Sequence, residues 1–362
     1  MGVEIRLTDR ELPVSPVFID FLAHLLEGRP FDDGEWADQT SEKLNFGLPE
    51  LQRRAEAAAP GVMNDERGRA HVGRAYGLLL ALLTGDFKPI EDLQRRFHFI
   101  NVIGIPRTGG SYLTAELFRA LGIEPRRVPF AIAHDGFPEA GPFEIAPAAN
   151  SWVRSLHTMA EYLSMVELFF GAHTAHQGRI VVPKKLTKGI YAGGFFHRIL
   201  GEAVEHIVTL RHPVAACVST YEKSGGLPAD GRLLIRSNIE DWCRRDLLYT
   251  GCTAPELERM DYFDAYLRYW EQYHYYVATT GLSANRELRV VVYGKERLQA
   301  LAQHFHQRFG STLAPGQFKV NTTARERHPE WIKRAEPALQ RVAGLWERVG
   351  IALPLGELAE CW

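Results

Sequence analysis

The stretch from Phe97 to Gly122 constrains the fold of this chain more than any other. An apolar run, Phe99 to Ile105, leads into a short loop that contains two adjacent glycines. Leucines then recur at every fourth residue, the spacing of one buried helical face, until Gly122 ends the pattern. The stretch therefore predicts a buried strand, a tight loop and a helix. Such a loop points backbone N–H groups at one place in front of the helix, which is typical of phosphate sites.

The loop of this stretch matches part of the nucleotide-binding pattern G-x-x-x-x-G-K-[ST]. Gly104, Gly109 and Ser111 occupy three of its fixed positions, and Gly110 stands where the lysine is expected. A cation for a transferred group must therefore come from elsewhere, and Arg107 in the same loop is the candidate. An ordinary turn between a strand and a helix, with a surface arginine, is the alternative.

A second stretch, His206 to Ser224, also predicts a strand followed by a helix. Ile207 to Leu210 is apolar, Arg211 stands at the end of this run, and Pro213 opens a helix that carries Ser219. A guanidinium group and a hydroxyl can hold one phosphate together through charge-assisted hydrogen bonds. The stretch therefore predicts a second phosphate site.

The two stretches, in this order and each after a strand, resemble the sulfotransferases whose donor is PAPS (3′-phosphoadenosine 5′-phosphosulfate). Residues 106–111 look like the family's 5′-phosphosulfate loop, and Arg211 with Ser219 looks like its 3′-phosphate motif. The resemblance covers residues 97 to 320 and departs from the family at Gly110-Ser111, where two hydroxyl residues are more usual. It implies a set of donor-binding residues: Arg107, Thr108, Gly109, Gly110, Ser111, Tyr112, Arg211 and Ser219.

The irregular segment 122–150, rich in proline and glycine, is where the resemblance places the catalytic base. In several members of the family, the residue that deprotonates the acceptor lies in the segment after the donor-binding helix. His134 lies there, and histidine suits the task because its ordinary pKa is close to a neutral working pH. A solvated loop histidine is the alternative reading, and the other candidates for the base are Asp135, Glu139 and Glu144.

A third predicted strand, RIVVPKK at 179–185, ends in two lysines. The family carries a lysine or histidine at the end of this strand, facing the sulfuryl group, where a cation neutralises charge on the leaving oxygen. Lys185 is the expected catalytic cation and Lys184 the fallback. Two solvated loop lysines are the alternative.

The strands expected near 99–105, 180–184, 206–210 and 289–293 alternate with helices. This order predicts an α/β domain over 97–362, with a central parallel sheet flanked by helices on both faces. The resemblance makes it a P-loop-like sulfotransferase fold. Residues 1–96 predict a helical region, one of whose helices should stop at Pro60-Gly61. This region is expected to form a cap, an oligomer contact or a wall of the acceptor pocket.

Bulk properties narrow the partners. The net charge of −2 offers no general attraction to nucleic acid, so an anionic donor needs a local cluster such as Arg107, Lys184, Lys185 and Arg211. The four cysteines fit no metal motif or disulfide framework, which indicates a reducing compartment. No secretory signal and no apolar run long enough to span a bilayer stand out, so we expect a cytoplasmic protein without membrane contact.

The expected reaction is therefore transfer of a sulfuryl group from PAPS to a hydroxyl or phenol of a small-molecule acceptor. The products are the sulfated acceptor and 3′,5′-ADP, and no metal is expected. Two other classes stay open. One is a P-loop-type kinase with a displaced cation, and the other is a nucleotide-binding member of the fold without turnover. The acceptor and the oligomeric state cannot be deduced from the sequence.

Overall fold

The computed structural model describes residues 14–28, 48–134, 149–173, 175–282, 288–310, 313–318 and 328–360. The chain forms two compact units, one of residues 1–93 with 126–174 and the other of 94–125 with 175–362. The sequence had suggested a single boundary at residue 96. Residues 126–174 instead group with the N-terminal helices, because the long helix α8 (Ala149–Phe170) packs along α4 (Glu66–Thr84).

The first unit is helical. Ser15 starts α1 (Pro16–Leu26): its hydroxyl accepts the N–H of Phe18 at 3.2 Å, and Pro16 takes the first helical position, where no N–H is needed. Most side chains of α1 are buried, in contact with α3, α4 and α8. The unit also contains a short helix, α7 (Phe130–Ala133).

The helix α3 (Leu48–Asn64) corrects one expectation. The sequence predicted an end at Pro60-Gly61, but the helix continues through Pro60 to Asn64. Leu51, Ala55 and Val62 are buried on one face of α3, which packs against α1. We attribute the continuation to this packing, which extends past the proline and opposes the cost of about 3 kcal/mol that a proline imposes inside a helix.

The second unit is an α/β domain, which confirms the predicted fold class. Its sheet contains β1 (Phe97–Ile103), β2 (Ile180–Lys185), β3 (Glu205–Leu210) and β4 (Leu288–Val292). The strands lie in the order β2-β1-β3-β4, and every pair is parallel. Because β1 and β3 are neighbours, the segments that follow their carboxyl-terminal ends lie side by side.

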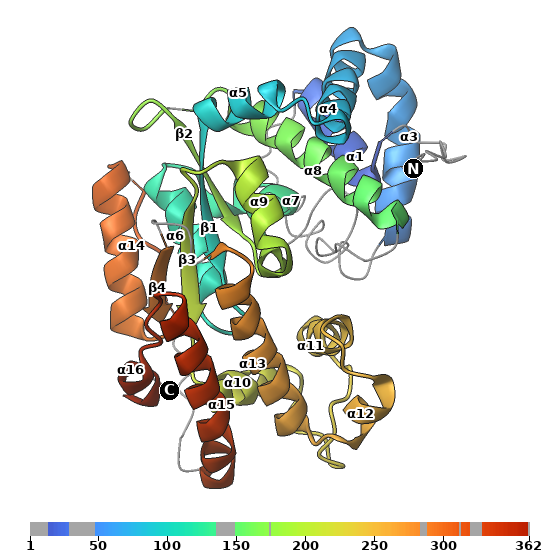
Figure 1. Ribbon diagram of the computed structural model, residues 1–362. Coiled ribbons are helices and arrows are strands. Elements are labelled where there is room, and N and C mark those ends of the chain that lie inside the picture. The colour runs from blue at the N-terminus through green and yellow to red at the C-terminus, as the bar shows by residue number, and fades with distance from the viewer. Residues whose placement is uncertain are drawn as a thin grey trace. The chain divides into compact units, whose positions relative to one another are not determined.

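Helices flank both faces of this sheet. The connection from β1 to β2 runs in one direction across the sheet, and those to β3 and β4 run in the other. Since such connections are right-handed, their helices fall on opposite faces. Figure 1 shows α6 (Gly110–Ala120) and α14 (Lys295–Phe309) on one side, with α9 (Gly193–Leu200) and α13 (Tyr262–Thr279) on the other.

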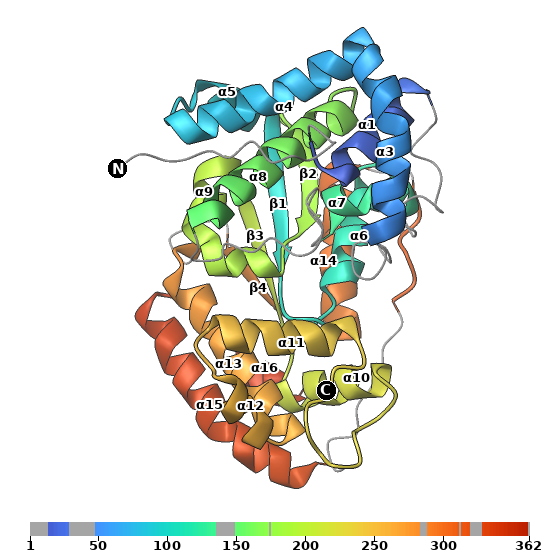
Figure 2. The same ribbon diagram turned by 90° about the vertical axis from the view of Figure 1, so that its right-hand side faces the viewer.

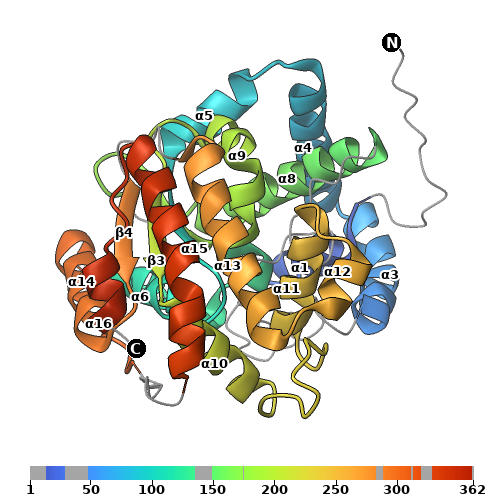
Figure 3. The same cartoon turned by 60° about the horizontal axis from the view of Figure 1, so that its bottom comes forward.

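One core cluster of the α/β unit lies under α6 and α14, whose leucines and phenylalanines pack on Ile100, Val102 and Ile207 of the strands. On the other side, α13 runs beside α15 (Pro329–Arg348), as Figure 3 shows. There the indole N–H of Trp346 donates to the carbonyl of His274 at 2.8 Å.

Further helices of this unit are α10 (Pro213–Lys223), α11 (Asn238–Tyr249), α12 (Ala254–Arg259) and α16 (Leu355–Glu360). Figure 2 shows α10 and α11 near the carboxyl-terminal ends of the strands. A short 3₁₀ segment, η1 (Pro125–Arg127), follows α6, and a second one, η2 (Lys188–Ala192), follows β2. The helix α5 (Lys88–Arg96) leads directly into β1. None of the helices in the described ranges has the length and apolar character needed to cross a bilayer.

Candidate functional site: an anion site at the ends of β1 and β3

The loop between β1 and α6 is tightly constrained. Arg107 and Gly109 both have positive φ, 72° and 92°, and for arginine this conformation is strained. Gly104 has no room for a side chain, because a Cβ atom there would lie 2.1 Å from the hydroxyl oxygen of Thr209. The positive φ values of Arg107 and Gly109, with the close approach of Gly104 to β3, therefore define a tight turn before α6.

Thr108 holds the loop from inside. Its hydroxyl donates to the carbonyl of Ile105 at 2.7 Å, and its oxygen lies 2.7 Å from the hydroxyl oxygen of Thr209 on β3. The side chain is only 1% exposed. Thr108, predicted to bind the donor, thus has its hydroxyl engaged in tying the loop to the neighbouring strand.

The amino terminus of α6 has the features of an anion site. Gly109 is the N-cap, so the capping residue has no side chain to accept a hydrogen bond from the first turn. The first-turn N–H groups of a helix have no acceptor within it, and the helix dipole adds positive potential at the same place. Glycine is needed at position 109 for packing, since a Cβ there would lie 2.7 Å from Leu298. The first-turn N–H groups that follow are the ones that bind tetrahedral anions in loops of this kind.

Arg211 follows β3 and is buried beside this loop, with 1% of its surface exposed. Its Nη1 donates to the carbonyl oxygen of Arg107 at 3.3 Å, and its guanidinium carbon lies 4.1 Å from the ring centroid of Tyr293. The indole N–H of Trp270 donates to the backbone carbonyl of Arg211 at 3.1 Å. Burial lowers the pKa of Arg211, but an arginine in a protein stays protonated. The site therefore contains a fixed, desolvated positive charge.

The two sequence motifs meet through Arg107 and Ser219. The Nε of Arg107 donates to the hydroxyl oxygen of Ser219 on α10 at 3.0 Å. Ser219 is 2% exposed, whereas Arg107 is half-buried. Residues more than a hundred positions apart thus share one hydrogen-bonded cluster of Arg107, Arg211 and Ser219.

The two lysines at the end of β2 lie on opposite faces of the sheet, since side chains alternate along a strand. Lys185 pairs with Val102 and faces α6; its Cε lies 3.4 Å from where a Cβ on Gly110 would stand. Lys184 pairs with Asn101 and faces the other side. The geometry thus puts Lys185, and not Lys184, beside the loop.

A network that sequence reasoning missed surrounds Lys185. Its ammonium group lies 5.9 Å from the ring centroid of Trp242 on α11, and that of Lys188 lies 5.5 Å from the same ring. Lys188 forms a buried ion pair with Asp246, and the hydroxyl of Tyr191 donates to the same carboxylate at 2.7 Å. Lys188, Asp246 and Tyr191 thus form a buried polar network beside Lys185. No local pattern indicated Trp242 or Asp246, which lie on α11 and are more than fifty residues from Lys185 in the sequence.

The remaining predicted donor residues differ in their surroundings. Ser111 is exposed in the first turn of α6. Tyr112 instead packs into the core under α6, with its ring centroid 4.6 Å from that of Phe318, and burial raises its pKa to about 12. The phenol of Tyr112 therefore stays protonated at neutral pH.

His134 belongs to the helical unit, where it follows α7. Its imidazole stacks on the ring of Phe130, with centroids 4.6 Å apart and planes 19° from parallel. The other candidates for the base, Asp135, Glu139 and Glu144, lie outside the described residues. The structure thus brings Arg107, Arg211, Ser219 and Lys185 to one sheet edge and assigns His134 to the other unit.

Within the described residues, no group of three or more histidine, cysteine or acidic side chains could hold a metal ion. The cluster at the ends of β1 and β3 is cationic, and its donors are guanidinium, ammonium, hydroxyl and backbone N–H groups. Such a donor set suits phosphate and sulfate esters. Comparison with known proteins adds no identity: no family model matches the chain, and neither do any curated protein or solved structure.

Proposed function

We propose that this protein is a PAPS-dependent sulfotransferase. The observation that carries the proposal is the contact between the two predicted motifs: Arg211 donates to the backbone of Arg107, whose side chain donates to Ser219. A 5′-phosphosulfate loop and a 3′-phosphate motif must lie close together if they are to bind the two anionic groups on one ribose. The N–H groups at the amino terminus of α6 and the buried charge of Arg211 suit the two anionic groups of PAPS.

The proposed roles follow from position. Gly109, Gly110 and Ser111 bind the 5′-phosphosulfate through the first turn of α6. Arg211 and Ser219 bind the 3′-phosphate and distinguish PAPS from ATP. Arg107 and Lys185 neutralise charge on the sulfuryl oxygens and on the leaving phosphate.

The proposed base is His134, which accepts the proton of the acceptor hydroxyl. In this step the acceptor oxygen forms a bond to sulfur, and the bond from sulfur to the bridging phosphate oxygen breaks. The electron pair of the broken bond stays on 3′,5′-ADP, whose new charge faces Lys185. The acceptor is a small molecule with a hydroxyl or phenol group.

We propose that the protein is located in the cytoplasm. Three cysteines in the described part of the chain, Cys217, Cys243 and Cys252, are buried free thiols, which is consistent with a reducing compartment.

Thermal unfolding with nucleotides tests the donor site. At 100 times its dissociation constant, a ligand that binds only the folded state stabilises it by about 2.7 kcal/mol. We expect 3′,5′-ADP to raise the Tm by several degrees, and 5′-AMP, 2′,5′-ADP and ATP with Mg²⁺ to raise it less at equal concentration. A screen of hydroxylated acceptors with PAPS then measures turnover.

Three outcomes would contradict the proposal in different ways. Equal shifts from 3′,5′-ADP and 5′-AMP would remove the 3′-phosphate site. A larger shift from ATP with Mg²⁺ would favour the kinase. A strong and selective shift from 3′,5′-ADP without turnover of any acceptor would favour a binding protein of the same fold.

A further inference from the structure

A pocket lies at the amino-terminal ends of β3 and β4, away from the anion site at the carboxyl-terminal ends of β1 and β3. It has a volume of about 410 Å³ and opens between the edge strand β4 and the carboxyl-terminal half of α14. Glu205 and Leu288, the first residues of β3 and β4, line it, whereas the loop with Arg107 follows the carboxyl-terminal end of β1. The volume is within the range of small-molecule sites. The proposed function makes no use of this pocket.

The charges in the pocket do not cancel. Arg308 donates to both oxygens of the Glu205 carboxylate, at 2.8 and 2.6 Å, and Nε2 of His98 lies 2.7 Å from one of them. Although burial alone raises the pKa of Glu205, the hydrogen bonds with His98 and Arg308 lower it to about 2. Glu205 is therefore ionised at neutral pH, and the guanidinium of Arg308 balances its charge.

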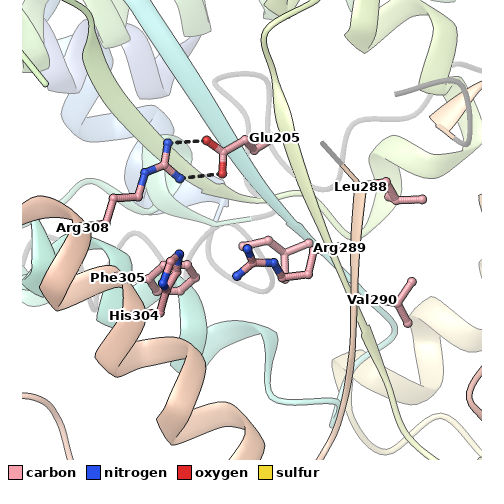
Figure 4. Close-up of a pocket in the computed structure, with 8 residues that line it drawn as sticks. Glu205, Leu288, Arg289, Val290, His304, Phe305 and Arg308 are labelled. Atoms are coloured by element: carbon pink, nitrogen blue, oxygen red, sulfur yellow. Dashed lines mark hydrogen bonds and ion pairs between the residues drawn. The ribbon is translucent and has the colours of Figure 1, made fainter. Parts of the chain in front are cut away.

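Arg289 supplies the charge that is left over. It is exposed on β4 and forms no ion pair with any residue in the described ranges. With Arg308 matched by Glu205, the guanidinium of Arg289 gives the pocket a net charge of +1 when the histidines are neutral. Figure 4 shows Arg289 reaching from β4 toward Phe305 and His304 on α14, next to the Arg308–Glu205 pair.

The free edge of β4 adds hydrogen-bond donors. Tyr293 donates its N–H to Leu210 of β3, and N–H groups of successive strand residues point in opposite directions. Residues separated from Tyr293 by an odd number of positions therefore direct their N–H groups away from β3. Leu288 and Val290 are such residues, and both line the pocket. No further strand of the described residues pairs with this edge. These N–H groups add backbone donors along the β4 side of the pocket.

We propose that this pocket binds a small oxyanion, a carboxylate or phosphate, with Arg289 as the cation that contacts it. The guanidinium fork matches either oxyanion in a bidentate manner. Phe305 and Ile207 also line the pocket but are almost fully buried, so polar and charged groups make up most of its surface. This site is independent of the donor site.

Fluorine NMR titrations test the proposal with 4-fluorobenzoate and 4-fluorophenyl phosphate, and with 4-fluorobenzyl alcohol as a neutral probe. We expect one or both anions to bind, and the stronger of the two identifies the oxyanion. Arg289→Met should weaken that binding by about 10- to 100-fold, the loss of a charged hydrogen bond. Arg289→Lys, which keeps the charge but not the fork, should lose less.

Two control variants locate the bound probe. Arg348→Met removes an exposed arginine at the end of α15 and should leave binding unchanged. Arg107→Ala alters the anion site at the carboxyl-terminal ends of the strands and should also leave binding of the probe unchanged. Failure of both anions to bind, equal binding of the neutral alcohol, or binding that is lost in Arg107→Ala and kept in Arg289→Met would each overturn the proposal.

Discussion

Replacing Arg211 by methionine should separate recognition of the 3′-phosphate from stability of the fold. Methionine is long and apolar, so it can occupy the buried volume without leaving a charge there. The change removes the hydrogen bond to the carbonyl of Arg107, at 3.3 Å, and the contact of the guanidinium with the ring of Tyr293, at 4.1 Å. It also removes the need to bury a positive charge in a side chain that is 1% exposed.

The effects on stability oppose each other. The hydrogen bond of a charged group contributes about 1.5–3 kcal/mol and a desolvated cation–π contact about 2 kcal/mol. Desolvating an ion costs several kcal/mol, which the methionine variant avoids. We therefore expect the free energy of unfolding to change by no more than about 2 kcal/mol.

The effect on binding has no such compensation, because the 3′-phosphate loses its desolvated partner. Losses of this kind are about 2–4 kcal/mol, or about 30- to 700-fold in Kd. Calorimetric titration of 3′,5′-ADP and 5′-AMP into both proteins measures this directly. The Kd of 3′,5′-ADP should rise by that factor, and the Kd of 5′-AMP should change little.

The ratio of the two dissociation constants decides the matter. If Arg211→Met weakened both nucleotides equally, the arginine would act through the loop and not on the 3′-phosphate. If it weakened neither, the assignment of this residue to the nucleotide site would be wrong. Arg348→Met, which removes an exposed arginine elsewhere, is the matched control and should leave both constants unchanged.

Five further substitutions test other parts of the site. Arg107→Ala should keep the fold, since the side chain is half-exposed, and lower PAPS turnover by about 10²–10³-fold; near-normal turnover would place the sulfuryl group elsewhere. Lys185→Met should reduce kcat strongly while Lys184→Met, on the other face of β2, should not, and the reverse result would exchange their roles. His134→Ala should lower kcat by about 10²–10⁴-fold with unchanged calorimetric affinity for 3′,5′-ADP, and a fully active variant would assign the base to another residue. Gly104→Ala should lower the free energy of unfolding by about 1–3 kcal/mol in denaturant titrations, because its Cβ would lie 2.1 Å from a hydroxyl of the neighbouring strand; an unchanged midpoint would mean that the loop adapts.

The sequence predicted the four strands of the sheet to within a few residues at each end. Apolar runs that end at glycine or at a charged residue have few alternatives to a buried parallel strand, and their alternation with helices implies parallel pairing. Local patterns were less reliable where packing opposes them. Pro60 is a helix-breaking residue by sequence, yet α3 continues through it, with Val62 buried beyond the proline on the face that packs against α1.

The sequence by itself determined the loop before α6, because glycines and the strand before them act over a few residues. It also indicated Arg211 and Ser219 as partners in one site, since strand ends meet at one edge of a parallel sheet. Only the tertiary structure decided that Lys185 faces the loop and that Tyr293 and Trp242 lie beside the two cations. These contacts join segments that are distant in the chain, so they depend on strand order and helix packing, which no local pattern records.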